Sequence, residues 1–530
     1  MQSQPLVVTG LIDHAAREHG AREIVTLWAD GREQRSNWAE VHLMARKMAQ
    51  ALRRLGIAKG DRIATLAMNH LHHLASWYGS AGIGGILHTV NPRLFDEQIV
   101  YIINHAADRM LLFDRQFLPI IERLRPQLTS VEHYILFDSE GEGDYVDFRA
   151  WIDAEDGRYE WVPLSENDAC GLCYTSGTTG NPKGVLYEHR SNVLHAYAAL
   201  QPDILDLSTR AVVLPIVPMF HANAWGLPYA CAASGSKMVL SATNDAVSLW
   251  RLIRNEKVSH SAGVPTVWLN MFADMDANGG DFGQLKLVII GGSAAPRAMI
   301  ERLMRAGIHV AHAWGMTETS PIGTIGARPH NWDDMGFDEQ VDMVCRQGRV
   351  PFGVELRSVD DDGNILPRDG KTAGQLQVRG PWIIQRYFEA EHDACDADGW
   401  FDTGDVAILH SDGIMQITDR AKDVIKSGGE WISSIELENA ALGCAGVAEA
   451  AAVGVPHPKW DERPILLVIR KADSAVSAEE ITAYLGDHVA KWWLPDEIIF
   501  VDTLPHTATG KLLKRQLRDE YKDYKLVSLV

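Results

Sequence analysis

The chain contains the stretch Tyr174-Thr175-Ser176-Gly177-Thr178-Thr179-Gly180-Asn181-Pro182-Lys183-Gly184. Its three glycines let the backbone come close to a phosphate and turn N–H groups inward, while the hydroxyl side chains and Lys183 add donors and a positive charge. Residues 169–174 before it have strand character and residues 189–200 after it have helical spacing, so we expect the loop to join a strand to a helix. The composition predicts a phosphate-binding loop.

The composition of this loop has two other interpretations. A Walker loop requires Gly-x-x-x-x-Gly-Lys-Ser/Thr, and here Gly184 follows the lysine and the preceding spacing differs. A flexible surface turn remains as an alternative, although turns rarely place hydroxyl groups between glycines.

The bulk composition limits the class of protein. With 530 residues and 46% hydrophobic content, the chain can bury a large core and form several domains. A formal net charge of −20 argues against nucleic acid as the main partner, because phosphate backbones are held by clustered Lys and Arg. No apolar run reaches the ~18 residues of a membrane span, and the N-terminus lacks a signal-peptide pattern. We therefore expect a cytoplasmic protein without a transmembrane segment.

The cysteine content points to a reducing compartment. Six cysteines are too few and too scattered for a disulfide framework in a chain of this length. Cys170 and Cys173 form a C-x-x-C, but they lie in the apolar strand that enters the phosphate loop. Core packing is the favoured interpretation, with redox or metal chemistry as the alternative.

Hydrophobic spacing predicts helices packed on a mainly parallel sheet. Residues 37–55 form an amphipathic helix with Asn37 as its cap, Glu40 three residues on and Gly56 at its end. Residues 287–290 form a strand, 296–306 a helix and 308–313 a second strand. Because such a crossover makes the two strands parallel, residues 291–293 and 314–318 should leave the same sheet edge and face one ligand.

Two further segments have unusual composition. Residues 215–229 begin with two prolines, Pro215 and Pro218, which are followed by His221 and Trp225; the histidine and the tryptophan are either core residues or part of a site. Beyond residue 422, strands at 448–455, 465–469 and 498–501 and a helix capped by Ser477 predict a small α+β domain. Its last loop, residues 505–511, is too polar for a core, carries Lys511 near its tip, and leads into a basic helix at 512–521.

The chain resembles the adenylate-forming superfamily of acyl-CoA synthetases, luciferases and adenylation domains over nearly its whole length, and three stretches carry this resemblance. They are the loop at 174–184, Pro218-Met219-Phe220-His221-Ala222-Asn223-Ala224-Trp225, and Lys426-Ser427-Gly428-Gly429-Glu430-Trp431-Ile432-Ser433-Ser434. The resemblance is closest to medium- and long-chain fatty acyl-CoA ligases and methylmercaptopropionyl-CoA ligases. It implies an α/β fold, with a large N-terminal domain of mainly parallel sheets covered by helices (residues 1–421) and a small mobile α+β domain (residues 422–530) hinged at Lys422.

The resemblance also implies roles for individual residues. Lys511 acts in catalysis together with Glu318 and His221, the last forming a wall between nucleotide and acyl pocket, and Trp225 gates the acyl tunnel. Glu318 and Thr175 hold Mg²⁺, unless Glu318 is a mere surface charge. The nucleotide is surrounded by Thr175, Ser176, Gly177, Thr178, Thr179, Lys183, Ala222, Gly292, Ser293, His312, Ala313, Trp314, Thr317, Asp405, Arg420 and Lys422. Asp405 accepts from the ribose hydroxyls.

The implied reaction has two steps that use different faces of the small domain. A carboxylic acid attacks ATP to give acyl-AMP, and coenzyme A then displaces AMP after rotation about Lys422 withdraws Lys511 and brings in Lys426, Gly428, Gly429 and Trp431. His506 stands where the superfamily usually has Arg or Lys, which alters the charge near Lys511. The resemblance further implies a homodimer formed through the large domains.

Several activities remain open at this point. The first expectation is an AMP-forming fatty acid–CoA ligase that uses Mg²⁺, ATP and coenzyme A. The alternatives are a methylmercaptopropionate or aryl acid ligase, a stand-alone adenylation protein that loads a carrier domain, and a luciferase-like oxygenase. A non-catalytic nucleotide-binding scaffold would have lost Lys511, Glu318 or the loop hydroxyls, and all are present.

Overall fold

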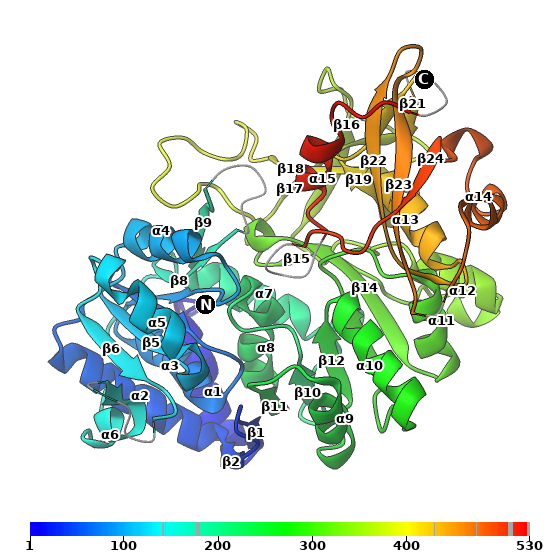
Figure 1. The fold of residues 1–530 in the computed structure, drawn as a ribbon. Helices are drawn as coiled ribbons and strands as arrows, with labels where there is room; N and C mark the ends of the chain where they lie inside the picture. The colour runs from blue at the N-terminus through cyan, green and yellow to red at the C-terminus, as the bar shows by residue number, and fades with distance from the viewer. Residues whose placement is uncertain are drawn as a thin grey trace.

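The computed structural model describes residues 1–139, 143, 145–175, 181–428, 430–472, 474–506 and 512–526. Within these residues the chain forms two large, mainly parallel sheets, a four-stranded sheet that follows them, and a five-stranded sheet in the C-terminal part (Figure 1). This arrangement confirms the predicted α/β class. The C-terminal sheet and its helices stand above the green part of the chain in Figure 1.

The first large sheet carries the predicted phosphate loop. Its order is β7-β6-β5-β3-β4-β8-β9, and all neighbours are parallel except β8 and β9. Its strands are β3 (Arg62–Leu66), β4 (Ile86–Thr89), β5 (Met110–Phe113), β6 (His133–Leu136), β7 (Val146–Asp147), β8 (Ala169–Tyr174) and β9 (Gly184–Glu188). A strand whose two faces are both covered by other elements consists of a continuous run of apolar residues, and β5 is such a strand.

The second large sheet has the order β15-β14-β13-β12-β10-β11-β1-β2, with antiparallel pairs only at its two ends. Its strands are β1 (Glu23–Leu27), β2 (Glu33–Asn37), β10 (Val212–Pro215), β11 (Lys237–Ser241), β12 (His260–Gly263), β13 (Leu287–Ile290), β14 (His309–Gly315) and β15 (Ile322–Ile325). The parallel pairing of β13 and β14 confirms the predicted crossover unit.

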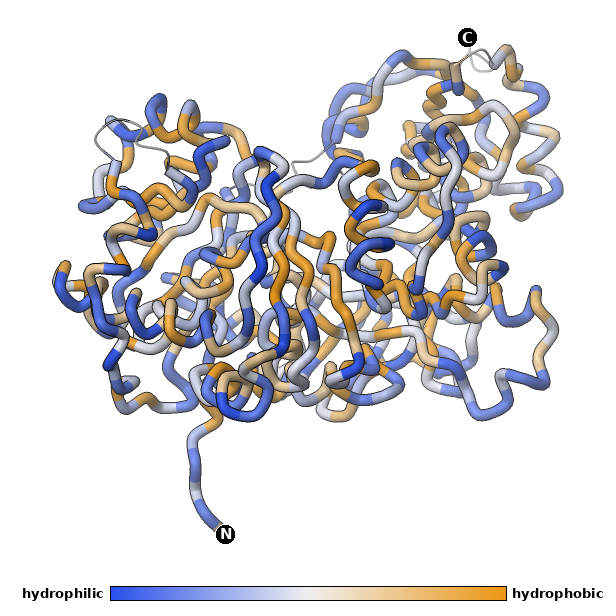
Figure 2. The backbone as a smooth tube through the Cα atoms, turned by 90° about the horizontal axis from the view of Figure 1, so that it is seen from below, coloured by the Kyte–Doolittle hydropathy of each residue, from blue (hydrophilic) through white to orange (hydrophobic). Residues whose placement is uncertain are grey.

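Helices form layers between and outside these sheets. The core between the sheets is built with α1 (Val8–His19), α2 (Trp38–Arg54), α3 (Leu71–Gly82), α6 (Phe148–Asp153), α7 (His189–Ala199) and α8 (Leu227–Ser234). The outer face of the first sheet is covered by α4 (Asp96–Ala106) and α5 (Leu118–Leu124). The outer face of the second sheet is covered by α9 (Ala246–Asn255), α10 (Pro265–Asn278), α11 (Arg297–Arg305) and α12 (Phe337–Val344). Apolar residues accordingly run through the interior strands in Figure 2.

The last two sheets meet at the predicted hinge. The antiparallel four-stranded sheet contains β16 (Glu355–Val359), β17 (Ala373–Arg379), β18 (Phe401–Leu409) and β19 (Met415–Arg420). The C-terminal unit contains β20 (Ile425–Ser427), β21 (Glu430–Ile432), β22 (Val447–His457), β23 (Asp461–Arg470), β24 (Glu497–Phe500), α13 (Ser434–Leu442), α14 (Ala478–Gly486) and α15 (Lys514–Tyr521). Lys422 lies between β19 and β20, so it connects the two sheets; the domain division at this residue stays a prediction.

Short 3-10 helices complete the described chain. They are η1 (Arg115–Phe117), η2 (Arg125–Gln127), η3 (Ala222–Gly226), η4 (Thr317–Thr319), η5 (Trp332–Asp334) and η6 (Lys491–Trp493). Among the described helices, none combines the length and the apolar character needed to cross a bilayer.

Local signals located several elements correctly. Asn37 caps α2 by accepting from the backbone N–H of Glu40, and Gly56 follows the helix with φ of 77°. Ser477 and Glu480 form the predicted capping box of α14. Cys170 and Cys173 are buried free thiols whose pKa values burial raises to about 12 and about 11, which agrees with core packing.

The expectation that the phosphate loop leads directly into a helix is wrong. Residues 184–188 form β9, which pairs antiparallel with β8, and α7 begins only after it. The sequence Gly-Val-Leu-Tyr-Glu has β-branched and aromatic residues that favour a strand once β8 offers a partner. The loop therefore connects two antiparallel neighbouring strands, and α7 begins only after the second of them.

Candidate active site

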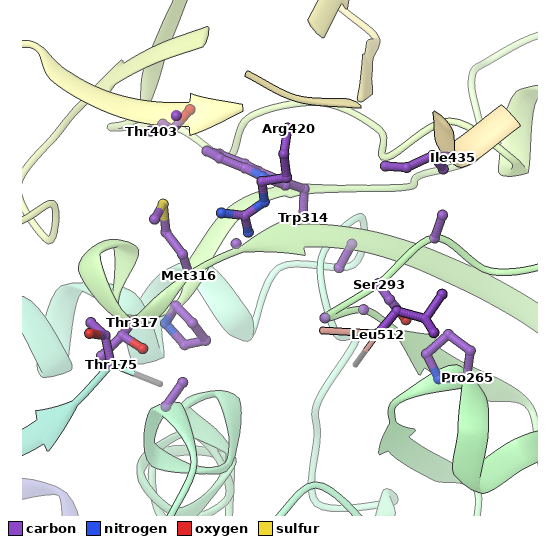
Figure 3. A pocket seen from close by; sticks show the side chains of 18 of the residues that line it. Thr175, Pro265, Ser293, Trp314, Met316, Thr317, Thr403, Arg420, Ile435 and Leu512 are labelled. Carbon is purple, nitrogen blue, oxygen red and sulfur yellow. The ribbon is translucent and has the colours of Figure 1, made fainter. Parts of the chain in front are cut away.

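One large cavity of about 1410 Å³ lies between the two large sheets' carboxyl edges and the C-terminal unit. Figure 3 shows Thr175 and Thr317 together on one side, Ser293, Pro265 and Leu512 on the other, and Trp314 beside Arg420. The predicted site residues that line the cavity are Thr175, Lys183, His221, Ala222, Trp225, Gly292, Ser293, Ala313, Trp314, Thr317, Glu318, Arg420 and Lys422. Segments far apart in the sequence thus converge on one space.

The base of the phosphate loop is closed by two hydrogen bonds. The backbone N–H of Thr175 donates to the carbonyl of Lys183 at 2.9 Å, and the N–H of Lys183 donates to the Thr175 hydroxyl at 3.3 Å. Both residues line the cavity, so the loop begins and ends at the cavity wall. The predicted phosphate contacts Ser176, Gly177, Thr178 and Thr179 lie outside the described residues.

Glu318 is the carboxylate that the sequence assigns to a metal. It lies on η4 and is 6% exposed, and one oxygen, Oε1, accepts a hydrogen bond from the Tyr387 hydroxyl at 2.7 Å. Burial raises the pKa of Glu318, while the bond from Tyr387 and the charges of Arg420 and Lys183 oppose the rise. Its position inside the cavity argues against a surface charge.

The donors around Glu318 fit a magnesium ion. Glu318 and Thr175 supply carboxylate and hydroxyl oxygens to the same cavity, and Mg²⁺ prefers oxygen ligands, keeps several waters and takes substrate phosphates. Among the described residues no cluster of three or more His, Cys, Asp or Glu side chains forms a closed metal cage. A site with one carboxylate suits an ion that arrives with ATP.

His312 does not line this cavity. Successive side chains of a strand point to opposite faces, so Ala313 faces the cavity while its neighbour His312 is buried behind it. Its Nδ1 lies 3.1 Å from the carbonyl oxygens of Val344 and Cys345, and its Nε2 accepts from the backbone N–H of Ala295 at 3.4 Å. Burial lowers the pKa of His312 to about 4. This neutral ring contacts the 291–295 loop through Ala295, and its predicted place around the nucleotide stays a prediction.

Asp405 also lies behind the wall. Its Oδ2 accepts from the Trp314 indole N–H at 2.8 Å, its Oδ1 pairs with Arg420 Nε at 2.7 Å, and it is 3% exposed. The cavity is lined instead by Trp314, Arg420 and the neighbouring Thr403 and Gly404. The structure thus gives Asp405 a supporting position behind Trp314 and Arg420, and its predicted contact with the ribose hydroxyls stays a prediction.

Trp225 lies on a backbone turn of unusual geometry. Ala222, Asn223, Ala224 and Trp225 have φ of 41°, 57°, 46° and 55°, followed by Gly226 at 76°. A run of left-handed residues costs roughly 1–2 kcal/mol per non-glycine residue, so surrounding packing must hold it. Packing against His195 holds the turn, because the His195 ring fills the space where a Cβ of Gly226 would lie.

An apolar branch of the cavity lies beside Trp225. The Trp225 ring tip, Cη2, is 3.4 Å from where a Cβ on Gly291 would stand, so a larger residue at 291 would press against the indole. The aliphatic residues that line the cavity and belong to the hydrophobic cluster against which Trp225 packs define this apolar branch; they are Leu205, Leu227, Ala262, Ile289, Ile322 and Ile325. His221 and Trp225 are both half-buried on this wall, which places them on the cavity rather than fully inside the core.

Two family models match the sequence: AMP-binding enzyme over residues 12–388, and AMP-binding enzyme C-terminal domain over residues 436–511. The chain belongs to the AMP-binding enzyme family. It is 49% identical to a 3-methylmercaptopropionyl-CoA ligase of Ruegeria lacuscaerulensis, covering 99% of this chain and 98% of the relative. It is 46% identical to a medium-chain-fatty-acid–CoA ligase of Ectopseudomonas oleovorans, covering 100% of this chain and 98% of the relative. Among solved structures, an anthranilate CoA ligase in complex with anthranoyl-AMP matches with a TM-score of 0.86 and 25% identity over 98% of both chains.

In this AMP-binding enzyme the C-terminal unit reaches the cavity from the opposite side. His506 and Leu512, on either side of the 507–511 stretch, both line the cavity, and they form an antiparallel bridge with each other. Lys511 itself lies outside the described residues. Lys514 follows it, is buried, and pairs with Glu438 at 2.7 Å.

The residues predicted to serve the second step lie elsewhere on the C-terminal unit. Lys426, Gly428 and Trp431 do not line the cavity, and Gly429 lies outside the described residues. Gly428 has φ of 63°, and its N–H donates to the carbonyl of Trp460 at 2.7 Å. This set reaches the cavity only if the C-terminal unit moves.

Sequence reasoning missed two tyrosines of the AMP-binding enzyme. Tyr187 on β9 donates from its hydroxyl to the carbonyl of Thr317 at 2.8 Å and is fully buried. Tyr387 lies in a segment without strand or helix and contacts Glu318. Neither belongs to a stretch with unusual composition, because both act through contacts that are distant in the sequence.

Proposed function

We propose that this chain is an ATP-dependent, AMP-forming acyl-CoA ligase that activates a fatty or related aliphatic carboxylic acid. The observation that carries the proposal is the continuity of the cavity, which joins the base of the phosphate loop, the carboxylate of Glu318 and the apolar branch beside Trp225. Acyl-CoA ligases that match at 46–49% identity over nearly the whole chain support it.

The first step joins two anions. A carboxylate oxygen of the acid forms a bond to the α-phosphorus of ATP, the bond to the bridging oxygen breaks, and pyrophosphate leaves. When bound, Mg²⁺ supplies positive charge to the phosphate oxygens. Lys183 and the loop N–H groups neutralise the pyrophosphate side, and Lys511 spans the carboxylate and the α-phosphate. Thr175 and Glu318 would hold the metal.

The second step transfers the acyl group. The thiol of coenzyme A loses its proton and forms the thioester bond to the acyl carbon, and the carbon–oxygen bond breaks so that AMP leaves. Rotation of the C-terminal unit about Lys422 withdraws Lys511 and brings Lys426, Gly428, Gly429 and Trp431 to the cavity. We further propose that the enzyme acts as a homodimer in the cytoplasm.

The walls of the apolar branch favour an uncharged tail. Leu205, Leu227, Ala262, Ile289, Ile322 and Ile325 offer no charged partner to a second carboxylate or an amine. An alkyl chain fits such walls, and a thioether chain such as that of methylmercaptopropionate fits them as well, since its sulfur is nearly apolar. An aryl acid and a carrier-domain acceptor are the remaining alternatives.

A mass-spectrometric assay tests the proposal. The protein is incubated with ATP, Mg²⁺, coenzyme A and a mixture of straight-chain, thioether and aryl acids, and thioesters and AMP are measured together. We expect acyl-CoA and AMP in equal amounts, with aliphatic or thioether acids preferred. Formation of acyl-AMP without any acyl-CoA would instead indicate a carrier-domain acceptor, and absence of both products would overturn the proposal.

A further inference from the structure

Residues 382–388, here called the connecting segment, hydrogen-bond to two separate parts of the site. At one end, the N–H of Ile384 donates to the carbonyl of Glu318 at 2.8 Å, and the Ser320 hydroxyl donates to the carbonyl of Trp382 at 2.7 Å. At the other end, the N–H of Phe388 donates to the carbonyl of Gly184 at 2.8 Å. The segment therefore links η4, which bears Glu318, to Gly184 at the exit of the phosphate loop.

Tyr387 makes the same connection with its side chain. Its hydroxyl donates to Glu318 Oε1 at 2.7 Å, and its ring centroid lies 4.8 Å from Lys183 Nζ. Its backbone forms an antiparallel bridge with Val185, and the residue lines the cavity. One side chain thus touches both the carboxylate assigned to the metal and the cation assigned to the phosphates.

A phenol suits this position for two reasons. Its hydroxyl orients the Glu318 carboxylate without adding the positive charge of Arg or Lys, which would compete with a metal ion. Its ring face attracts the Lys183 ammonium while leaving the N–H groups of that lysine available to an anion. Hydrogen-bond donors behind a metal ligand fix its orientation, and their loss typically lowers metal affinity or activity 10–100-fold.

From these contacts we infer that Tyr387 is a positioning residue for the adenylation step, fixing Glu318 and Lys183 relative to each other so that both meet the metal–ATP complex. The inference rests on the proposed function, because it assumes that Glu318 binds the metal and Lys183 the phosphates. A purely structural role for the buried phenol is the competing explanation.

Substitution of Tyr387 separates the two explanations. Tyr387→Phe removes the hydroxyl and keeps the ring over Lys183. We expect the Mg²⁺ concentration for half-maximal acyl-AMP formation to rise about tenfold, with thioester formation from supplied acyl-AMP within about twofold of the unmodified enzyme. Tyr387→Leu also removes the ring, and we expect it to raise the KM for ATP in addition.

Binding measured without turnover gives an independent readout. Mn²⁺ serves as the probe, and electron paramagnetic resonance follows its binding to the full-length protein in the presence of ATP. The affinity should fall about tenfold in Tyr387→Phe. In a Glu318→Gln background the same substitution should have little further effect, because the hydroxyl acts through that carboxylate.

Tyr78→Phe is the matched control. Tyr78 is a fully buried tyrosine of the same large domain whose hydroxyl donates to the carbonyl of Pro228 at 2.9 Å, away from the cavity wall. Its loss should lower stability without changing the Mg²⁺ requirement. A Tyr387→Phe enzyme with unchanged Mg²⁺ requirement and Mn²⁺ affinity would overturn the inference, as would equal loss of both steps with a larger fall in Tm than in the control. Failure of the unmodified enzyme to make acyl-CoA would count against the proposed function instead.

Discussion

Trp314 and Asp405 are joined by a hydrogen bond of 2.8 Å from the indole N–H to Oδ2, and this bond connects the C-terminal end of β14 in the second large sheet to β18 of the four-stranded sheet. Arg420 completes the arrangement by pairing with the other carboxylate oxygen. Two cavity-lining side chains are thus fixed by one buried carboxylate. The carboxylate that positions Trp314 and Arg420 therefore lies behind the cavity surface that these two side chains form.

Replacing Asp405 by Asn should therefore weaken nucleotide binding. The amide can still accept from Trp314, but it loses the ion pair and turns an N–H group toward Arg420. Charge-assisted hydrogen bonds contribute about 1.5–3 kcal/mol, so we expect AMP affinity to fall about tenfold or more in calorimetric titration, with the KM for the acid little changed. Trp314→Phe removes the indole N–H but leaves the ion pair between Asp405 and Arg420 in place, so a larger effect in that variant would contradict the assignment.

The Trp225→Ala enzyme tests the predicted acyl gate. Removing the indole opens space beside Gly291, and each methylene newly buried contributes up to ~0.8 kcal/mol. We expect kcat/KM to rise severalfold for longer or bulkier acids relative to short ones, measured over a straight-chain series. An unchanged chain-length profile beside a large fall in Tm would make Trp225 a packing residue only.

The Lys511→Ala enzyme tests the two-step cycle. The lysine is proposed to act in the first step and to be withdrawn in the second, so acyl-AMP formation should fall about a hundredfold or more, while thioester formation from supplied acyl-AMP should persist. Rapid-quench assays of each step measure this. Equal loss in both steps would refute rotation about Lys422 as the reason for the difference.

His195 predicts a pH dependence of stability. It lies on α7, is buried against the Gly226 turn, and accepts from the backbone N–H of Ile322 at 3.3 Å; burial lowers its pKa from 6.5 to about 4. Below pH 6.5 the unfolded chain takes up a proton that the folded chain refuses, so stability is lost as pH falls from 6.5 toward 4. One such group changes the free energy of unfolding by about 2 kcal/mol between pH 7.5 and pH 5.

The measurement is the difference in Tm between pH 7.5 and pH 5, compared for the unmodified enzyme and His195→Gln. The glutamine has no charge to gain, so its Tm should fall less across this range, whatever its stability at neutral pH. Equal falls in the two proteins would show that the imidazole is already charged or accessible in the fold.

The sequence predicts what local signals control. The cap of α2, the crossover around α11 and the capping box of α14 follow from residue order alone, and the structure has each of them. The strand β9 escaped prediction because five residues become a strand only when β8 pairs with them. The phosphate-binding role of the preceding loop stays a prediction, and the expectation that it leads directly into a helix is wrong because β9 follows it.

The direction in which a side chain points is a second feature that could not be predicted from the sequence. A resemblance transfers positions along the chain, but His312 and Ala313 occupy opposite faces of β14, and only the structure shows which one meets the cavity. Tyr387 was not predicted as a site residue for a different reason. Its partners Glu318 and Lys183 lie 69 and 204 positions away along the chain, and nothing in its neighbourhood distinguishes it from an exposed turn.

The burial of the cysteines has a practical consequence for following the movement of the C-terminal unit. Cys170, Cys173, Cys231 and Cys444 are buried, and only Cys345 and Cys395 are intermediate in exposure. After replacement of those two, maleimide reagents would meet few accessible thiols in the folded protein. A pair of engineered surface cysteines, one on α9 and one on α14, could then carry a donor and an acceptor dye. Single-molecule fluorescence would report the distance between them during each turnover.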